Sequence, residues 1–159
     1  MTYENILFTI EAGIARLTLN RPDRLNSFND AMHAEVRDAL ERVRAEASTR
    51  VLLLTGAGRG FCAGADMEAT FQTRIDGVDP GDDTAGGEGG LPRGLDWVAQ
   101  VRDAKPMLAA VNGAAVGIGL TMILPCDVIV ASERARFGMF FIKMGLVPEL
   151  ASTHFLVQR

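Results

Sequence analysis

Apolar and polar positions alternate near the start of the chain in two short runs. The runs cover residues 6–10 and 14–19 and flank the spacer Glu11-Ala12-Gly13. A period of two predicts a strand, and a short spacer containing Gly between two such runs predicts a hairpin. We therefore expect the chain to begin with two antiparallel strands.

The next stretch changes to a helical period. Its apolar residues recur at spacings of four, four and three, with Arg and Glu between them: Met32, Val36, Leu40 and Val43. Such spacing predicts an amphipathic helix, which we expect over residues 29–47. Ser27 and Asn29 are the candidate N-caps of this helix.

Strand-like and helix-like segments alternate along the rest of the chain. Residues 51–55 are so apolar that they predict a strand buried on both faces of a parallel sheet. The other expected elements are a short helix around residues 97–101 that ends by Pro106, a strand over 107–111, a short buried helix over 120–124, a strand over 126–131 and a helix from about Pro148. This alternation predicts α/β architecture.

Composition excludes several functional classes. The net charge is −4 and no Lys/Arg cluster occurs, so we expect neither a nucleic-acid partner nor an anionic membrane. No apolar run approaches the length of a membrane span and the first residues do not resemble a signal peptide, which predicts a cytoplasmic protein. The two cysteines lack C-x-x-C spacing and nearby His pairs, so neither a disulfide framework nor a metal site is expected.

Two Gly- and Ala-rich segments are the strongest candidates for chemistry. Residues 59–67 and 112–119 each follow an apolar strand-like run and lead into a segment that can begin a helix. Two such turns can direct two backbone N–H groups at one oxygen atom, which is the geometry of an oxyanion hole. The alternative is two ordinary tight turns, in which Gly supplies positive φ and close packing.

Between these segments lies a stretch of unusual composition. Residues 76–94 contain seven Gly, two Pro and five acidic residues. This composition predicts a mobile Gly/Asp-rich loop within one domain of residues 1–159, instead of a second domain. An active-site flap and a solvated insertion are both compatible with it.

Four blocks of sequence resemble a known family. In chain order they are Leu19-Asn20-Arg21-Pro22-Asp23-Arg24-Leu25-Asn26-Ser27-Phe28, Phe61-Cys62-Ala63-Gly64-Ala65-Asp66, Ala110-Val111-Asn112-Gly113, and Cys126-Asp127 with Phe137-Gly138. Their order is similar to that of the crotonase (enoyl-CoA hydratase/isomerase) superfamily. Within it, the chain most resembles the single-glutamate branch of Δ3,Δ2-enoyl-CoA isomerases.

This resemblance implies a crotonase-like ββα spiral core that processes an acyl-CoA thioester. Coenzyme A would arrive as part of the substrate, with no cofactor tightly bound. Crotonase-like proteins normally continue into a C-terminal helical region that packs between subunits, so the chain resembles a core truncated before that region. A homotrimer or hexamer is expected if the region is present.

The resemblance also implies roles for particular residues. The backbone N–H groups of Ala65 and Ile118 would be the oxyanion-hole donors. Coenzyme A would be recognised by six residues: Arg24 and Leu25 near the pantetheine and phosphates, and Cys62, Ala63, Asp66 and Met67 along the adenine and thiol path. For Arg24, a solvated surface arginine is the simpler interpretation.

The acid/base residues decide which reaction is expected. The two glutamates of the hydratases in this family align with Thr121 and Phe141, neither of which can accept a proton at neutral pH. Glu149 matches the single acid/base residue of the isomerase branch. We expect four apolar residues to desolvate its carboxylate and raise its pKa: Phe140, Phe141, Ile142 and Leu146. A helix beginning near Pro148 would lower that pKa.

Three functions therefore remain open. The leading hypothesis is an enoyl-CoA isomerase, the second a hydratase (a lyase) with a non-standard catalytic pair, and the third a CoA-binding or partner-binding homologue without turnover. Glu149 has a structural alternative, because acids favour the first turn of any helix. A triad of Glu149, Ser152 and His154 is disfavoured because no G-x-S-x-G motif occurs.

Overall fold

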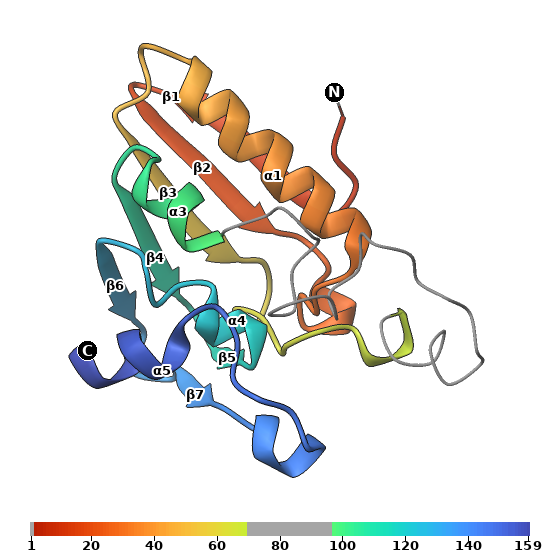
Figure 1. Cartoon of the computed structure of the whole chain (residues 1–159). Helices are drawn as coiled ribbons and strands as arrows, with labels where there is room; N and C mark the ends of the chain where they lie inside the picture. The colour runs from red at the N-terminus through yellow and green to blue at the C-terminus, as the bar shows by residue number, and fades with distance from the viewer. Residues whose placement is uncertain (1, 70–96) are drawn as a thin grey trace.

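A five-stranded sheet organises the chain (Figure 1). The computed structural model describes residues 2–69 and 97–159. The strands lie in the order β1 (Ile6–Glu11), β2 (Ile14–Leu19), β3 (Val51–Gly56), β4 (Met107–Val111) and β6 (Val128–Ala131). The first pair is antiparallel, which confirms the predicted hairpin, and every other neighbouring pair is parallel.

The long amphipathic helix is also confirmed. Helix α1 (Asp30–Ala45) buries the predicted apolar residues together with Ala39. Of the two candidate caps, Asn29 is the one used, because its side chain accepts a hydrogen bond of 2.9 Å from the Met32 N–H. Figure 1 shows α1 lying across β1 and β2, so its apolar stripe closes the core over the hairpin.

The other helices are short. They are α3 (Trp97–Arg102), α4 (Ile118–Thr121), α5 (Ser152–Phe155) and the 3-10 turns η1 (Pro22–Arg24), η3 (Phe141–Met144) and η4 (Leu156–Gln158). The Trp97 indole N–H donates to the Met122 carbonyl at 2.9 Å, which joins α3 to the turn after α4.

Strand β3 differs from its prediction. Leu52 and Leu54 are buried, but Val51, Leu53 and Thr55 are only half-buried, so the strand buries one face fully and the other partly. An uninterrupted apolar run does not specify how many residues of the rest of the chain pack on each face of a sheet. The described residues cover the face that carries Val51, Leu53 and Thr55 incompletely.

A second, two-stranded parallel sheet was not predicted. It joins β5 (Ala114–Val116) to β7 (Arg136–Gly138). Each strand has three residues, too few for a period of two to be recognised. Short elements also have poorly defined ends in the sequence pattern, which explains two wrong boundaries. Helix α4 begins at Ile118 instead of residue 120, and β6 begins at Val128 instead of residue 126.

The predicted loop over residues 76–94 lies outside the described residues. Among residues 2–69 and 97–159, no helix has the length and apolar character needed to cross a membrane.

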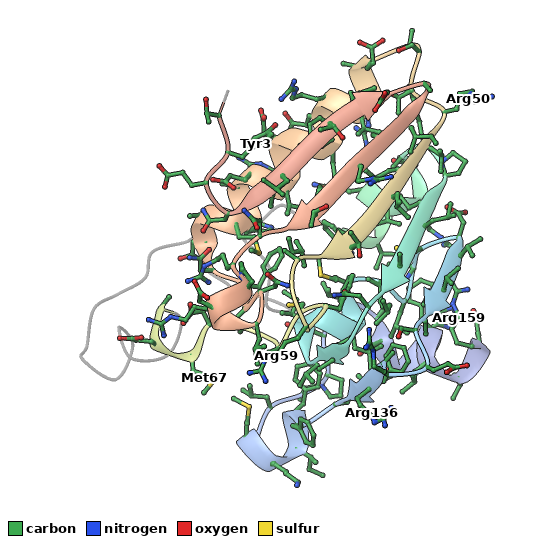
Figure 2. All side chains as sticks on the ribbon, turned by 180° about the vertical axis from the view of Figure 1, so that it is seen from behind. Tyr3, Arg50, Arg59, Met67, Arg136 and Arg159 are labelled. Carbon is green, nitrogen blue, oxygen red and sulfur yellow. The ribbon has the colours of Figure 1, made fainter. Side chains whose placement is uncertain are left out.

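The two Gly- and Ala-rich turns lie at the carboxyl ends of the parallel strands. Figure 2 places Arg59, Met67 and Arg136 near this end of the sheet and Arg50, which precedes β3, at the opposite end. Ligand sites in α/β sheets lie at the carboxyl ends of strands, because the loops there connect to helix N-termini.

One buried asparagine supports the first of these turns. Asn26 is fully buried, and its side-chain amide nitrogen lies 2.8, 3.0 and 3.1 Å from the carbonyl oxygens of Ala57, Gly60 and Phe61. Its Oδ1 accepts a hydrogen bond from the Arg21 N–H. The amide of Asn26 therefore satisfies carbonyl groups that the turn could not pair within itself.

Replacing Asn26 by Ala should lower the free energy of unfolding by about 3 kcal/mol, because buried carbonyl groups lose their donor. Asn112→Ala is the matched control, since the Asn112 amide also donates to this turn, at 3.0 and 3.2 Å, but from a more exposed position. We expect it to cost about 1 kcal/mol. Urea-induced unfolding measures both, and equal losses would contradict the role given to burial.

Candidate active site

The two Gly- and Ala-rich segments lie side by side. The Cys62 N–H donates to the Ala114 carbonyl and the Val116 N–H donates to the Cys62 carbonyl, each at 2.9 Å. These bonds form a parallel bridge between Cys62 and Ala115. Segments that are about fifty residues apart in the sequence are thereby held in one register.

Each segment then turns at a glycine. Three residues beyond the bridge, Ala65 and Ile118 each follow a glycine with positive φ, at 108° for Gly64 and 54° for Gly117. A Cβ on Gly64 would lie 3.3 Å from the Val116 oxygen, and one on Gly117 would lie 3.8 Å from the Gly64 Cα. The two turns are therefore in contact, and glycine allows both the conformation and the approach.

Both predicted donor groups are free. Within the described ranges, neither the Ala65 N–H nor the Ile118 N–H has a hydrogen-bond acceptor, although the Asp66 and Gly117 N–H groups beside them are paired. The bridge from Phe28 to this segment uses the Phe28 and Asp66 N–H groups and bypasses Ala65. Ile118 is the first residue of α4, and the first N–H groups of a helix have no partner within the helix. Two adjacent free donors can stabilise an oxyanion.

Glu149 approaches the same helix. Thr121, in the last position of α4, donates a hydrogen bond from Oγ1 to Glu149 Oε1 at 3.3 Å. Thr121 is fully buried and the glutamate is partly buried. The carboxylate thus contacts the helix whose first N–H is the second candidate donor.

Burial changes the acidity of Glu149. Loss of solvent around the carboxylate raises its pKa to about 7, and the hydrogen bond from Thr121 opposes this rise. The direction of the shift agrees with the prediction. A carboxyl group with a pKa near neutrality is suited to both accepting and returning a proton.

One of the predicted influences on this pKa is wrong. The helix after Glu149 begins at Ser152 and not near Pro148, because Leu150 and Ala151 adopt positive φ values of 54° and 52°. Among the apolar residues expected to desolvate the carboxylate, Ile142 is 87% exposed. Phe140 and Leu146 are also partly exposed, at 48% and 43%. The contribution of these apolar side chains to the burial of Glu149 stays a prediction.

The backbone next to Glu149 is strained. Consecutive non-glycine residues with positive φ cost on the order of 1–3 kcal/mol each, and they persist where the surrounding structure requires them. Here Leu150 is buried, and its burial in the core helps to hold the turn that presents Glu149.

The alternative triad is not formed. The Ser152 hydroxyl is buried and has no hydrogen-bond partner. The His154 ring contacts the Gln158 side chain at 3.1 Å and lies in an exposed position. No chain of hydrogen bonds joins serine, histidine and glutamate.

The residues predicted to recognise coenzyme A lie along one strip of paired backbone. The Ala63 N–H donates to the Leu25 carbonyl at 3.0 Å, and the Phe28 N–H donates to the Gly64 carbonyl at 2.8 Å. The structure thus brings the segment that contains Arg24 and Leu25 against the segment from Cys62 to Met67. Their roles toward coenzyme A stay predictions.

Several side chains in this strip already have partners. Arg24 forms an exposed ion pair with Glu68 at 3.1 Å, and Asp66 forms a more buried one with Arg21 at 2.9 Å. Burial alone would raise the pKa of Asp66, but the hydrogen bonds from Arg21 and the Ala69 N–H, with the charges of Arg21 and Arg24, hold it below its ordinary value. Asp66 is thus an ionised partner of Arg21. Met67 is exposed.

Neither thiol is a candidate nucleophile. Burial raises the pKa of Cys62 to about 11 and that of Cys126 to about 12, so both are protonated at neutral pH. Within the part of the chain that the structure describes, no cluster of three His, Cys, Asp or Glu side chains could hold a metal ion.

A separate hollow of about 550 Å³ lies at the other end of the sheet. It is lined by residues at the starts of β4 and β6 and by the end of the chain, including Pro106, Asp127 and Arg159. It contains none of the candidate residues.

Comparison with known proteins identifies the family of the chain. The profile of the enoyl-CoA hydratase/isomerase family matches residues 9–159. The 1,2-epoxyphenylacetyl-CoA isomerase of Escherichia coli is 43% identical over 157 residues, which cover 96% of this chain and 57% of that protein. The 2,3-dehydroadipyl-CoA hydratase of the same species is 37% identical over 142 residues, covering 89% and 52% respectively.

Solved structures show the same fold. An enoyl-CoA hydratase/isomerase from Pseudoalteromonas atlantica superposes with a TM-score of 0.81 at 33% identity, over 98% of this chain and 57% of that one. The chain therefore spans little more than half the length of the relatives it matches.

Glu149→Gln should change how stability depends on pH. The folded carboxyl has a pKa of about 7 against an ordinary 4.5, so between these values the folded state holds a proton that the unfolded chain has lost. The free energy of unfolding should therefore fall as pH rises through this window, by about 2–3 kcal/mol. The variant should lack that fall and be the more stable protein at pH 8.

Denaturant unfolding of both proteins at pH 4.5 and pH 8 measures this difference. The control is Glu41→Gln, which changes an exposed carboxylate on α1. Parallel stability curves for the native protein and Glu149→Gln would show that burial does not raise the pKa of Glu149.

Proposed function

The chain belongs to the enoyl-CoA hydratase/isomerase family, and from this premise we propose that it shifts the double bond of an enoyl-CoA thioester. The observation that carries the proposal is one partly buried carboxylate, Glu149, held by Thr121 on the helix that begins at the candidate donor Ile118. One acid/base group and one oxyanion hole are sufficient for this reaction.

The oxyanion hole would stabilise the intermediate. A thioester oxygen that accepts hydrogen bonds from the Ala65 and Ile118 N–H groups gains negative charge when the acidic proton leaves C2. Donors that are already oriented cost no reorganisation at that moment, and in comparable sites one donor is worth on the order of 3 kcal/mol.

Glu149 would move the proton. Its carboxylate takes a proton from C2 of a 3-enoyl thioester, and the electron pair of the broken C–H bond delocalises through the carbonyl and the C3–C4 double bond to form a dienolate. The protonated Glu149 then gives the proton to C4, and the double bond is left between C2 and C3. A pKa near neutrality suits both steps.

The threonine at position 121 favours isomerisation over hydration. A threonine occupies the position at which the hydratases that this sequence resembles carry a glutamate, and within residues 2–69 and 97–159 no charged side chain contributes to the pKa shift of Glu149. Addition of water would need a second group to activate it. The similarity to an isomerase from Escherichia coli also supports this choice.

We further propose that the strip formed by the segments 24–28 and 62–67 contacts the coenzyme A part of the substrate. Its backbone pairing to Gly64 would hold the thioester end of the ligand beside the Ala65 N–H. The homotrimer or hexamer stays a prediction.

Hydration is the second candidate reaction because a hydratase from Escherichia coli is 37% identical to this chain. It would require an unconventional second group. Incubation with a 2-enoyl-CoA in water labelled with ¹⁸O distinguishes the two reactions, since hydration places the label in the product and isomerisation does not.

The isomerase proposal predicts that the protein converts a 3-enoyl-CoA into the conjugated 2-enoyl-CoA, which is followed by its ultraviolet absorbance. Glu149→Gln should lower kcat by about 10²–10⁴-fold, the usual contribution of a general acid/base. Glu41→Gln serves again as the control and should keep full activity.

Binding of the acyl-CoA should survive in Glu149→Gln and can be measured by calorimetry. If this variant isomerises as fast as the native protein, Glu149 has a structural role. If the native protein binds the thioester and converts none of it, the third hypothesis, a CoA-binding homologue without turnover, replaces the isomerase.

A further inference from the structure

The Thr121 hydroxyl lies between two oxygen atoms. Glu149 Oε1 is 3.3 Å from Thr121 Oγ1, and the backbone carbonyl oxygen of Ile118 is 3.5 Å from it. Thr121 has no exposed surface, so bulk water does not compete for its hydroxyl. A hydroxyl has one hydrogen to donate and lone pairs to accept, so it can donate to only one of these oxygens at a time.

We propose that Thr121 is a positioning residue whose hydroxyl reverses its hydrogen bond as Glu149 gains and loses a proton. With Glu149 ionised, the hydroxyl donates to Oε1. With Glu149 protonated, the carboxyl O–H donates to Thr121 Oγ1, and the threonine hydrogen turns to the Ile118 carbonyl. The inference rests on the proposed function, in which Glu149 carries the proton.

This reversal would keep the carboxyl group in one place throughout the reaction. Both protonation states have a hydrogen-bond partner, so neither leaves a buried polar atom unpaired, and only a hydroxyl rotation separates them. The backbone of Thr121 is itself anchored, because its N–H donates to the Gly117 carbonyl at 2.9 Å. The base is therefore positioned from the same turn that presents the Ile118 N–H.

Among the described residues, no other ionisable group influences the pKa of Glu149 in this exchange. Helix α4 has none, and those on the elements that flank Glu149 in the sequence have other contacts: Lys143 of η3 lies over the Phe140 ring, and His154 of α5 contacts Gln158. Burial and the Thr121 hydrogen bond are the two influences on the pKa of Glu149. A change at Thr121 should therefore be visible in the titration of Glu149.

The test compares Thr121→Val, which keeps the shape of the side chain without its hydroxyl, with Thr121→Ser, which keeps the hydroxyl. In Thr121→Val the pKa of Glu149 should rise, as measured by carbon-detected NMR titration of the ligand-free protein. The kcat for a 3-enoyl-CoA should fall on the order of tenfold, as expected for one hydrogen bond to a charged group, with KM within about twofold. Thr121→Ser should restore both values.

Two outcomes would overturn the inference. One is an unchanged Glu149 titration in Thr121→Val, and the other is a Thr121→Ser protein as impaired as Thr121→Val, which would indicate a packing role. Thr121→Ala gives the same comparison if the valine variant does not fold. Failure of the proposed function is distinct, because it appears as a native protein without turnover or as a Glu149→Gln variant that stays active, whatever the NMR titration shows.

Discussion

The pairing of Cys62 with Ala115 is the constraint on which the site depends. Two hydrogen bonds of 2.9 Å hold the turns after β3 and β4 in one register, and each turn continues through a glycine with positive φ to a free N–H group. If the register slipped by one residue, the two amides would no longer lie at equivalent positions. The geometry of the candidate oxyanion hole is thus a consequence of ordinary backbone pairing at the carboxyl ends of parallel strands.

The pKa of Glu149 is set by burial more than by neighbouring charges. Among the described residues, the carboxylate of Glu149 has no cationic partner. The loss of solvation therefore raises its pKa, and the hydrogen bond from the Thr121 hydroxyl opposes this. Asp66 shows the opposite balance, because Arg21 compensates for its burial and keeps it ionised. The two acids lie in the same chain, and their neighbours give them different protonation behaviour.

Backbone strain lies next to Glu149, whereas the hydrogen bonds that stabilise the first turn come from Asn26. Leu150 and Ala151 hold positive φ values next to Glu149, where the carboxylate must be presented, while Asn26 satisfies the carbonyl groups of the first turn from the core. The motif that contains Asn26 was recognised in the sequence, but its role was not, because a buried asparagine at positive φ looks like any polar loop residue until its partners are known.

The sequence by itself determined the hairpin, the amphipathic helix, the parallel strands and the identity of the residues in both turns, because these depend on local periodicity and glycine content. It could not determine the two short strands that pair the turns or the true start of the helix after Glu149. Nor could it show that Thr121 contacts Glu149, twenty-eight positions away. Pairings between distant segments and the burial of a carboxylate arise only when the chain is packed, and no local pattern encodes them.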